Sequence, residues 1–128
     1  MIDTLAVWHD IVRRRDIAPL AVLLADDVVF HSPVVHTPQL GKAITTLYLR
    51  GALQVLDTEH FRYVREIVGP RDALLEFVTE IDGLHVNGVD LIRWNDEGLI
   101  TDFKVMVRPL KAINALHHKM GELLQRLG

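Results

Sequence analysis

The second half of the chain alternates apolar and polar residues with a period of two, and this pattern limits the fold most strongly. The alternation covers residues 60–68, 73–82, 86–94 and 99–107. Short turns that contain glycine or proline separate these segments, as is typical of antiparallel strands that follow one another in a meander. We therefore expect one antiparallel sheet in this half of the chain.

Helical periodicity marks the rest of the chain. The expected elements are helices over 3–15, over 16–25, from 41 onward and over 110–127, with a short strand over 28–31. Helices come first, strands follow, and a last amphipathic helix closes the chain. This order favours the α+β class over a regular alternation of strands and helices.

Length and composition indicate one domain over residues 1–128. A chain of 128 residues with 49% hydrophobic residues can bury a sizeable core. The formal net charge is −3, and no basic patch stands out, so a nucleic-acid partner is not expected. The absence of cysteine excludes disulfides, thiolate catalysis and cysteine-ligated zinc.

No segment of the sequence indicates export or membrane insertion. The first residues lack the basic region and the apolar core of a signal peptide. No apolar run is long enough to span a bilayer. The cytoplasm is therefore the expected location, without a membrane partner.

One charged residue conflicts with the alternation of the strand over 86–94. One face of this strand carries Asp90 with Ile92 and Trp94, and the other carries Arg93 with Val89 and Leu91. A carboxylate on the apolar face of a sheet is costly unless it is paired, hydrogen-bonded or protonated. Either the strand is turned over, with Arg93 inside, or Asp90 has a structural or functional task.

Several segments resemble the nuclear transport factor 2-like superfamily, in its SnoaL-like branch. The resemblance rests on residues 24–34, 41–44, 88–100 and 106–110, and it covers essentially the whole chain. It implies a cystatin-like α+β cone, in which a curved sheet wraps around an N-terminal helical layer and an internal apolar pocket. The superfamily contains isomerases, cyclases, epoxide hydrolases and non-catalytic binders, so the fold alone does not decide the function.

Comparison with the ketosteroid isomerase pattern of this superfamily suggests catalytic residues. Asp90 falls on the oxyanion-binding Asp, and Trp8 falls on the oxyanion-binding Tyr. Ser32 falls on the catalytic base, and serine alone is no general base. His31 and His36 flank this position, and either has a pKa suited to replace the base.

A further set of residues is predicted to bind the ligand. This set consists of Trp8, Ser32, Tyr48, Phe77, Ile92, Phe103 and Val105. No cofactor is expected, because the sequence lacks a glycine-rich phosphate loop. No metal is expected either, since the two candidate histidines lack a third ligand at a suitable spacing.

Three functions remain open on this basis. The first is binding of a small apolar organic molecule in the internal pocket. The second is a cofactor-independent isomerase, polyketide cyclase or epoxide hydrolase that uses Asp90 with His31 or His36. The third is a protein-interaction module without a ligand. The resemblance also implies a homodimer formed through the outer face of the sheet.

Overall fold

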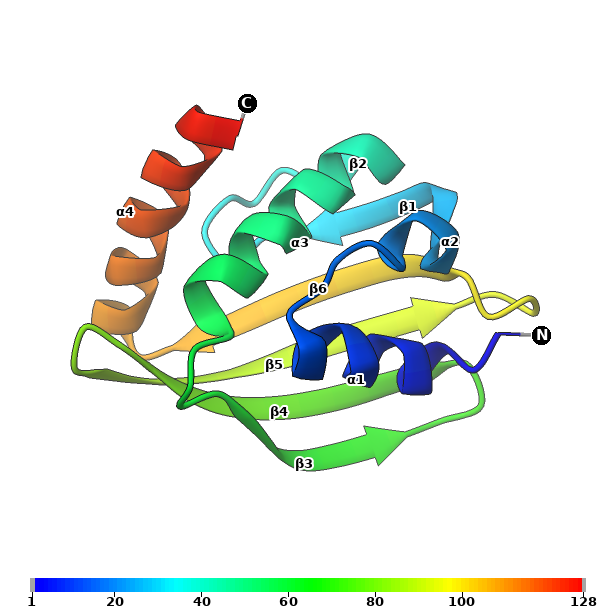
Figure 1. The fold of residues 1–128 in the computed structure, drawn as a ribbon, viewed down its shortest axis with the longest axis horizontal. Helices are drawn as coiled ribbons and strands as arrows, with labels where there is room; N and C mark the ends of the chain where they lie inside the picture. The colour runs from blue at the N-terminus through cyan, green and yellow to red at the C-terminus, as the bar shows by residue number, and fades with distance from the viewer. Residues whose placement is uncertain (1, 128) are drawn as a thin grey trace.

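The computed structural model describes residues 2–127 and shows a curved sheet of six strands with all helices on one face (Figure 1). The helices are α1 (Thr4–Arg14), α2 (Leu20–Leu23), α3 (Lys42–Leu56) and α4 (Leu110–Leu127). The strands are β1 (Leu24–His31), β2 (Gln39–Leu40), β3 (Arg62–Val68), β4 (Asp72–Ile81), β5 (Leu84–Trp94) and β6 (Ile100–Arg108). The predicted α+β class is confirmed.

The strands lie in the order β2-β1-β6-β5-β4-β3. Strands β3 to β6 form the expected antiparallel meander. Strand β1 pairs with β6 in parallel, so the complete sheet is mixed. The concave face carries α1 and α3, and α4 closes one end of the sheet (Figure 1). Among the described helices, none is long and apolar enough to cross a membrane.

The second helix is shorter than the sequence predicts, and the first strand is longer. Helix α2 has a single turn, and Leu24 already has the extended angles φ −87° and ψ 135°. Leu24 pairs with Ile100 of β6, and both side chains are buried. The apolar run that we assigned to a helix over 16–25 therefore gains more by joining the sheet than by extending a short helix.

Alternation along β4 and β5 defines an inner face toward the helices and an outer face. The inner side chains Leu75 and Phe77 are buried, and Leu75 lies opposite Asp90. Asp90 is only 6% exposed, whereas Arg93 on the other face is exposed. The strand is therefore not turned over, and the carboxylate of Asp90 lies in the core.

Strand β3 contains a bulge that changes which residues face inward. Tyr63 pairs with Phe77, and Arg65 pairs with Glu76, so Val64 is an extra residue between them. The bulge places Tyr63 on the inner face without bringing Arg65 there. Beyond it, Glu66 takes the inner side, where its carboxylate lies 2.7 Å from Nε2 of His9 on α1.

Candidate functional site

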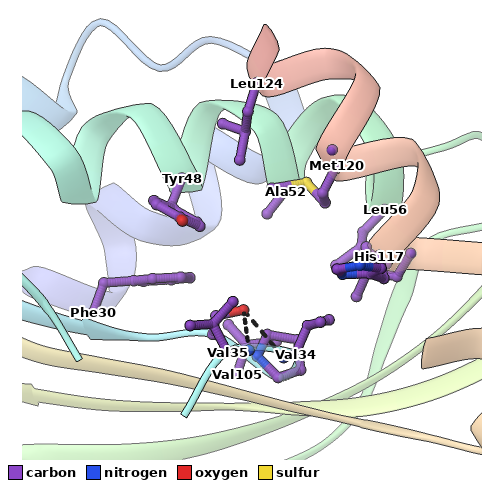
Figure 2. Close-up of a pocket in the computed structure, with 14 residues that line it drawn as sticks. Phe30, Val34, Val35, Tyr48, Ala52, Leu56, Val105, His117, Met120 and Leu124 are labelled. Atoms are coloured by element: carbon purple, nitrogen blue, oxygen red, sulfur yellow. Dashed lines mark hydrogen bonds between the residues drawn. The ribbon is translucent and has the colours of Figure 1, made fainter. Parts of the chain in front are cut away.

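An apolar cavity lies between α3, α4 and the loop over 32–35, on the helix side of the sheet (Figure 2). Its volume is about 200 Å³, and we call it the outer cavity. Its lining consists of Phe30, Ser32, Pro33, Val34, Val35, Tyr48, Ala52, Leu56, Val105, Leu116, His117, Met120, Gly121 and Leu124. Concave, mostly apolar cavities with few polar groups are typical of sites for small organic molecules.

A smaller cavity adjoins the outer one, and we call it the deep cavity. Its volume is about 30 Å³, which is room for about one or two water molecules. Ala52, Leu56 and Val105 line both cavities, so the two spaces share this wall. The other residues around the deep cavity are Trp8, Val12, Leu49, Leu53, Asp57, Phe61, Tyr63, Phe77, Asp90 and Phe103.

A chain of hydrogen bonds runs along the deep cavity. The indole Nε1 of Trp8 donates to the hydroxyl oxygen of Tyr63 at 2.9 Å. The Tyr63 hydroxyl in turn donates to Oδ2 of Asp90 at 2.6 Å. Indole can only donate, so the direction of both bonds is set from Trp8 toward Asp90. The other carboxyl oxygen of Asp90, Oδ1, is not part of this chain of hydrogen bonds.

Burial controls the protonation of this chain. Burial raises the pKa of Asp90 from 3.8 to about 7, although the hydrogen bond from Tyr63 acts in the opposite direction. Burial, with the neighbouring Asp90 carboxylate, also raises the pKa of Tyr63 well above its usual value. Near neutral pH, Asp90 therefore exists in both protonation states while Tyr63 stays a hydroxyl. The protonated carboxyl can donate to a ligand oxygen, and the carboxylate can accept from a ligand hydroxyl.

Most of the predicted ligand-binding residues lie around the two cavities. The deep cavity is lined by Asp90 and by the predicted binding residues Trp8, Phe77, Phe103 and Val105. The outer cavity is lined by Ser32, Tyr48 and, again, Val105. Ile92 is fully buried, but it lines neither cavity. The hydroxyl of Ser32 is engaged locally, because it accepts from the backbone nitrogens of Val34 at 3.1 Å and Val35 at 3.4 Å.

The two candidate histidines do not reach Asp90. His31 is at the end of β1, and the alternation of that strand puts it on the opposite face from Phe30, which lines the outer cavity. There Nε2 of His31 lies 3.0 Å from Oδ2 of Asp102. His36 is exposed in the loop before β2 and lines neither cavity. The structure thus separates both histidines from the buried carboxyl.

Two polar residues of the deep cavity are absent from the sequence predictions, Tyr63 and Asp57. The alternation of Phe61 and Tyr63 with charged neighbours is a usable signal for an inward Tyr63, but Arg65 breaks the pattern at the bulge. Asp57 follows the last residue of α3, and only the path of the chain after the helix brings it to the cavity. Among residues 2–127, no group of three or more histidine and acidic side chains is placed to hold a metal ion.

The family can now be assigned from comparison with known proteins. Residues 5–103 match the family model of the SnoaL-like domain. The chain belongs to the SnoaL-like domain family. The resemblance found in the sequence is thereby confirmed. No protein of curated function matches this SnoaL-like domain.

Solved structures agree with this assignment. This SnoaL-like domain is similar to a steroid delta-isomerase from Pseudomonas aeruginosa, with a TM-score of 0.92 and 39% identity over 97% of this chain and 90% of that chain. An uncharacterised protein from Silicibacter pomeroyi with a cystatin-like fold has a TM-score of 0.86 and 36% identity, over 95% of this chain and 85% of that chain. An NTF2-like protein of unknown function from Mesorhizobium loti has a TM-score of 0.72 at 20% identity, over 84% of this chain and 89% of that chain, and this likeness shows the fold alone.

Proposed function

We propose that this SnoaL-like domain binds a small, mostly apolar organic molecule that carries a carbonyl oxygen. The observation that carries this proposal is the buried carboxyl of Asp90, held by Tyr63 beside an apolar cavity. An apolar cavity with a few well-placed polar groups is the usual form of a small-molecule site. The similarity to a steroid delta-isomerase supports a ligand with an oxygen acceptor.

In this proposal, the ligand occupies both cavities. Its apolar body lies in the outer cavity, and its oxygen enters the deep cavity to accept a hydrogen bond from protonated Asp90. The outer cavity has about 200 Å³, which is below the roughly 300–1,000 Å³ of common ligand sites. The site therefore favours a ligand of one or two small rings over a larger polycyclic one.

The test measures binding of cyclohexanone and cyclohexenone by calorimetry at pH 6 and pH 8. Only protonated Asp90 can donate to a ketone, and its pKa of about 7 lies between these values. The apparent dissociation constant of wild type should therefore weaken by about tenfold at pH 8. Asp90→Asn, whose amide can donate at either pH, should bind without this pH dependence, and Asp90→Leu should lose the binding.

Asp102→Asn is the matched control. It removes a carboxylate that pairs with His31 away from both cavities, so the pH dependence of wild type should persist. Failure of wild type to bind either ketone, or equal binding at both pH values, would contradict the proposal. Proton NMR of cyclohex-3-enone in a separate incubation distinguishes binding from the second candidate, an isomerase, because the double bond of this isomer is not yet conjugated with the carbonyl. Migration of its double bond would support the isomerase, which the similarity to a steroid delta-isomerase favours.

A further inference from the structure

Asp57 is a second acidic residue beside the deep cavity, and one of its oxygens has no partner in the part of the chain that the structure describes. It follows α3 directly, and its side chain is only 7% exposed. Its Oδ1 lies 3.8 Å from Nε of the half-exposed Arg15. Its Oδ2 is fully buried, and no hydrogen-bond donor of residues 2–127 reaches it.

A buried carboxylate oxygen without a donor destabilises the fold. Burial raises the pKa of Asp57, and the positive charge of Arg15 opposes this effect. Arg15 is paired too loosely, and is too exposed, to offset the burial of both oxygens. The unpartnered oxygen can therefore accept a hydrogen bond from a donor outside the chain.

The position of Asp57 indicates where such a donor would be. Asp57 lines the deep cavity together with Tyr63 and Asp90. The hydroxyl group of Tyr63 already has two partners, because it accepts a hydrogen bond from Trp8 and donates one to Asp90. Asp57 is thus a second acidic group of this cavity, and its buried Oδ2 has no donor among residues 2–127. A ligand in the cavity could supply that donor.

We propose that Asp57 binds the ligand by accepting a hydrogen bond from a ligand hydroxyl group. The inference rests on the proposed function and narrows it to small hydroxylated carbonyl compounds. The carbonyl oxygen of such a compound meets Asp90, and its hydroxyl donates to Oδ2 of Asp57. The two groups therefore select a ligand that carries an acceptor and a donor at a set separation.

The test compares cyclohexanone with the isomeric hydroxycyclohexanones, at pH 6, by calorimetry. In wild type, the best-placed hydroxyl should strengthen binding by roughly tenfold or more, because it supplies a donor to a buried oxygen that otherwise has none. Asp57→Leu should lose the preference for the hydroxylated ketone, measured within the variant as the ratio of the dissociation constants of the plain and the hydroxylated ketone. Its melting temperature should not fall, because the substitution removes an unpartnered buried oxygen.

Arg15→Gln is the matched control. It removes the ion-pair partner of Oδ1 and leaves Oδ2 in place, so the preference for the hydroxyl should remain. Asp57→Ala supplies a second variant without the carboxylate, should Asp57→Leu not fold. Equal binding of the ketone and every hydroxyketone by wild type would overturn the role of Asp57 and leave the proposed function standing. Binding of none of these compounds would overturn both.

Discussion

A single buried carboxyl decides most of what this site can do. Asp90 lies on the inner face of the sheet and receives one hydrogen bond from Tyr63, which does not fully replace the water that a carboxylate loses on burial. Its protonated form is therefore favoured in the folded protein. The sequence already marks Asp90, because an acidic residue interrupts the apolar face of a strand, and it also marks Trp8 and Phe103. The signal for Tyr63 is weaker, because Arg65 breaks the alternation at the bulge, and Asp57 carries no signal, because the end of a helix brings it to the cavity.

The raised pKa of Asp90 predicts that stability falls as the pH rises. In the unfolded chain, the carboxyl ionises near its ordinary pKa of 3.8, whereas folding raises the pKa to about 7. The folded state therefore binds more protons between these values. The stabilisation is complete below the unfolded pKa and is lost as the pH rises through the folded one. Between pH 5 and pH 8, the free energy of unfolding should fall by about 2 to 3 kcal/mol from this group.

Urea unfolding of wild type and Asp90→Asn at several pH values checks this prediction. The free energy of unfolding of Asp90→Asn should rise relative to that of wild type as the pH rises. Burial also raises the pKa of Asp57, so this residue makes the free energy of unfolding fall with pH in the same direction, and equally in both proteins. Parallel stability curves for the two proteins would show that Asp90 ionises in the fold as readily as in water.

At the scale of elements, the meander was predictable because each strand carries its own alternation and its own turn residues. The parallel pairing of β1 with β6 was not, because it joins segments that are far apart in the sequence. The predicted length of the second helix is wrong for a related reason. An apolar run such as Leu20–Ala25 suits a buried helix or a buried strand equally, and only the partner strand decides between them.

Close packing between β4 and β5 leaves no room for a side chain at one glycine. Gly88 faces Phe77 across the pair, and a Cβ there would collide with the ring of Phe77 and lie 2.7 Å from the backbone oxygen of Met106. Gly88→Ala should lower the free energy of unfolding by about 1 to 3 kcal/mol. Because Phe77 lines the deep cavity, ketone binding should weaken as well.

Gly121→Ala is the matched comparison within a helix. A Cβ at Gly121 would meet no atom within 4 Å, and the residue lies inside α4. This substitution should raise the free energy of unfolding by about 0.5 to 1 kcal/mol, because alanine loses less conformational freedom in a helix. Urea unfolding of both variants tests the pair, and equal effects would refute the steric argument.

At the scale of the whole molecule, none of the helices within residues 2–127 covers the outer face of the sheet (Figure 1). Ile67, Leu74 and Leu91 lie side by side across three strands, and Val89 pairs with Met106 next to them. Ile67 is 54% exposed and Met106 is 47% exposed. An uncovered apolar patch of this kind is typical of a protein–protein contact.

We propose that two copies of the chain pair through this patch. Light scattering should give wild type a mass twice the 14.5 kDa of one chain. Leu91→Glu places a charge in the middle of the patch and should give the single-chain mass. Lys104→Gln, beside Leu91 on the same face, should keep the doubled mass. A wild type that runs as one chain at high concentration would rule out this contact.

The bulge in β3 also bears on solubility. Strand β3 is an edge of the sheet, and it exposes Val64, Ile67 and Val68. A straight apolar edge with free backbone groups is a template on which another chain can add a strand and begin a fibril. The extra residue Val64 interrupts the regular spacing of those groups, and Arg62 and Arg65 place charge on either side of it. The irregularity that brings Tyr63 to the deep cavity therefore also makes this edge a poorer template for aggregation.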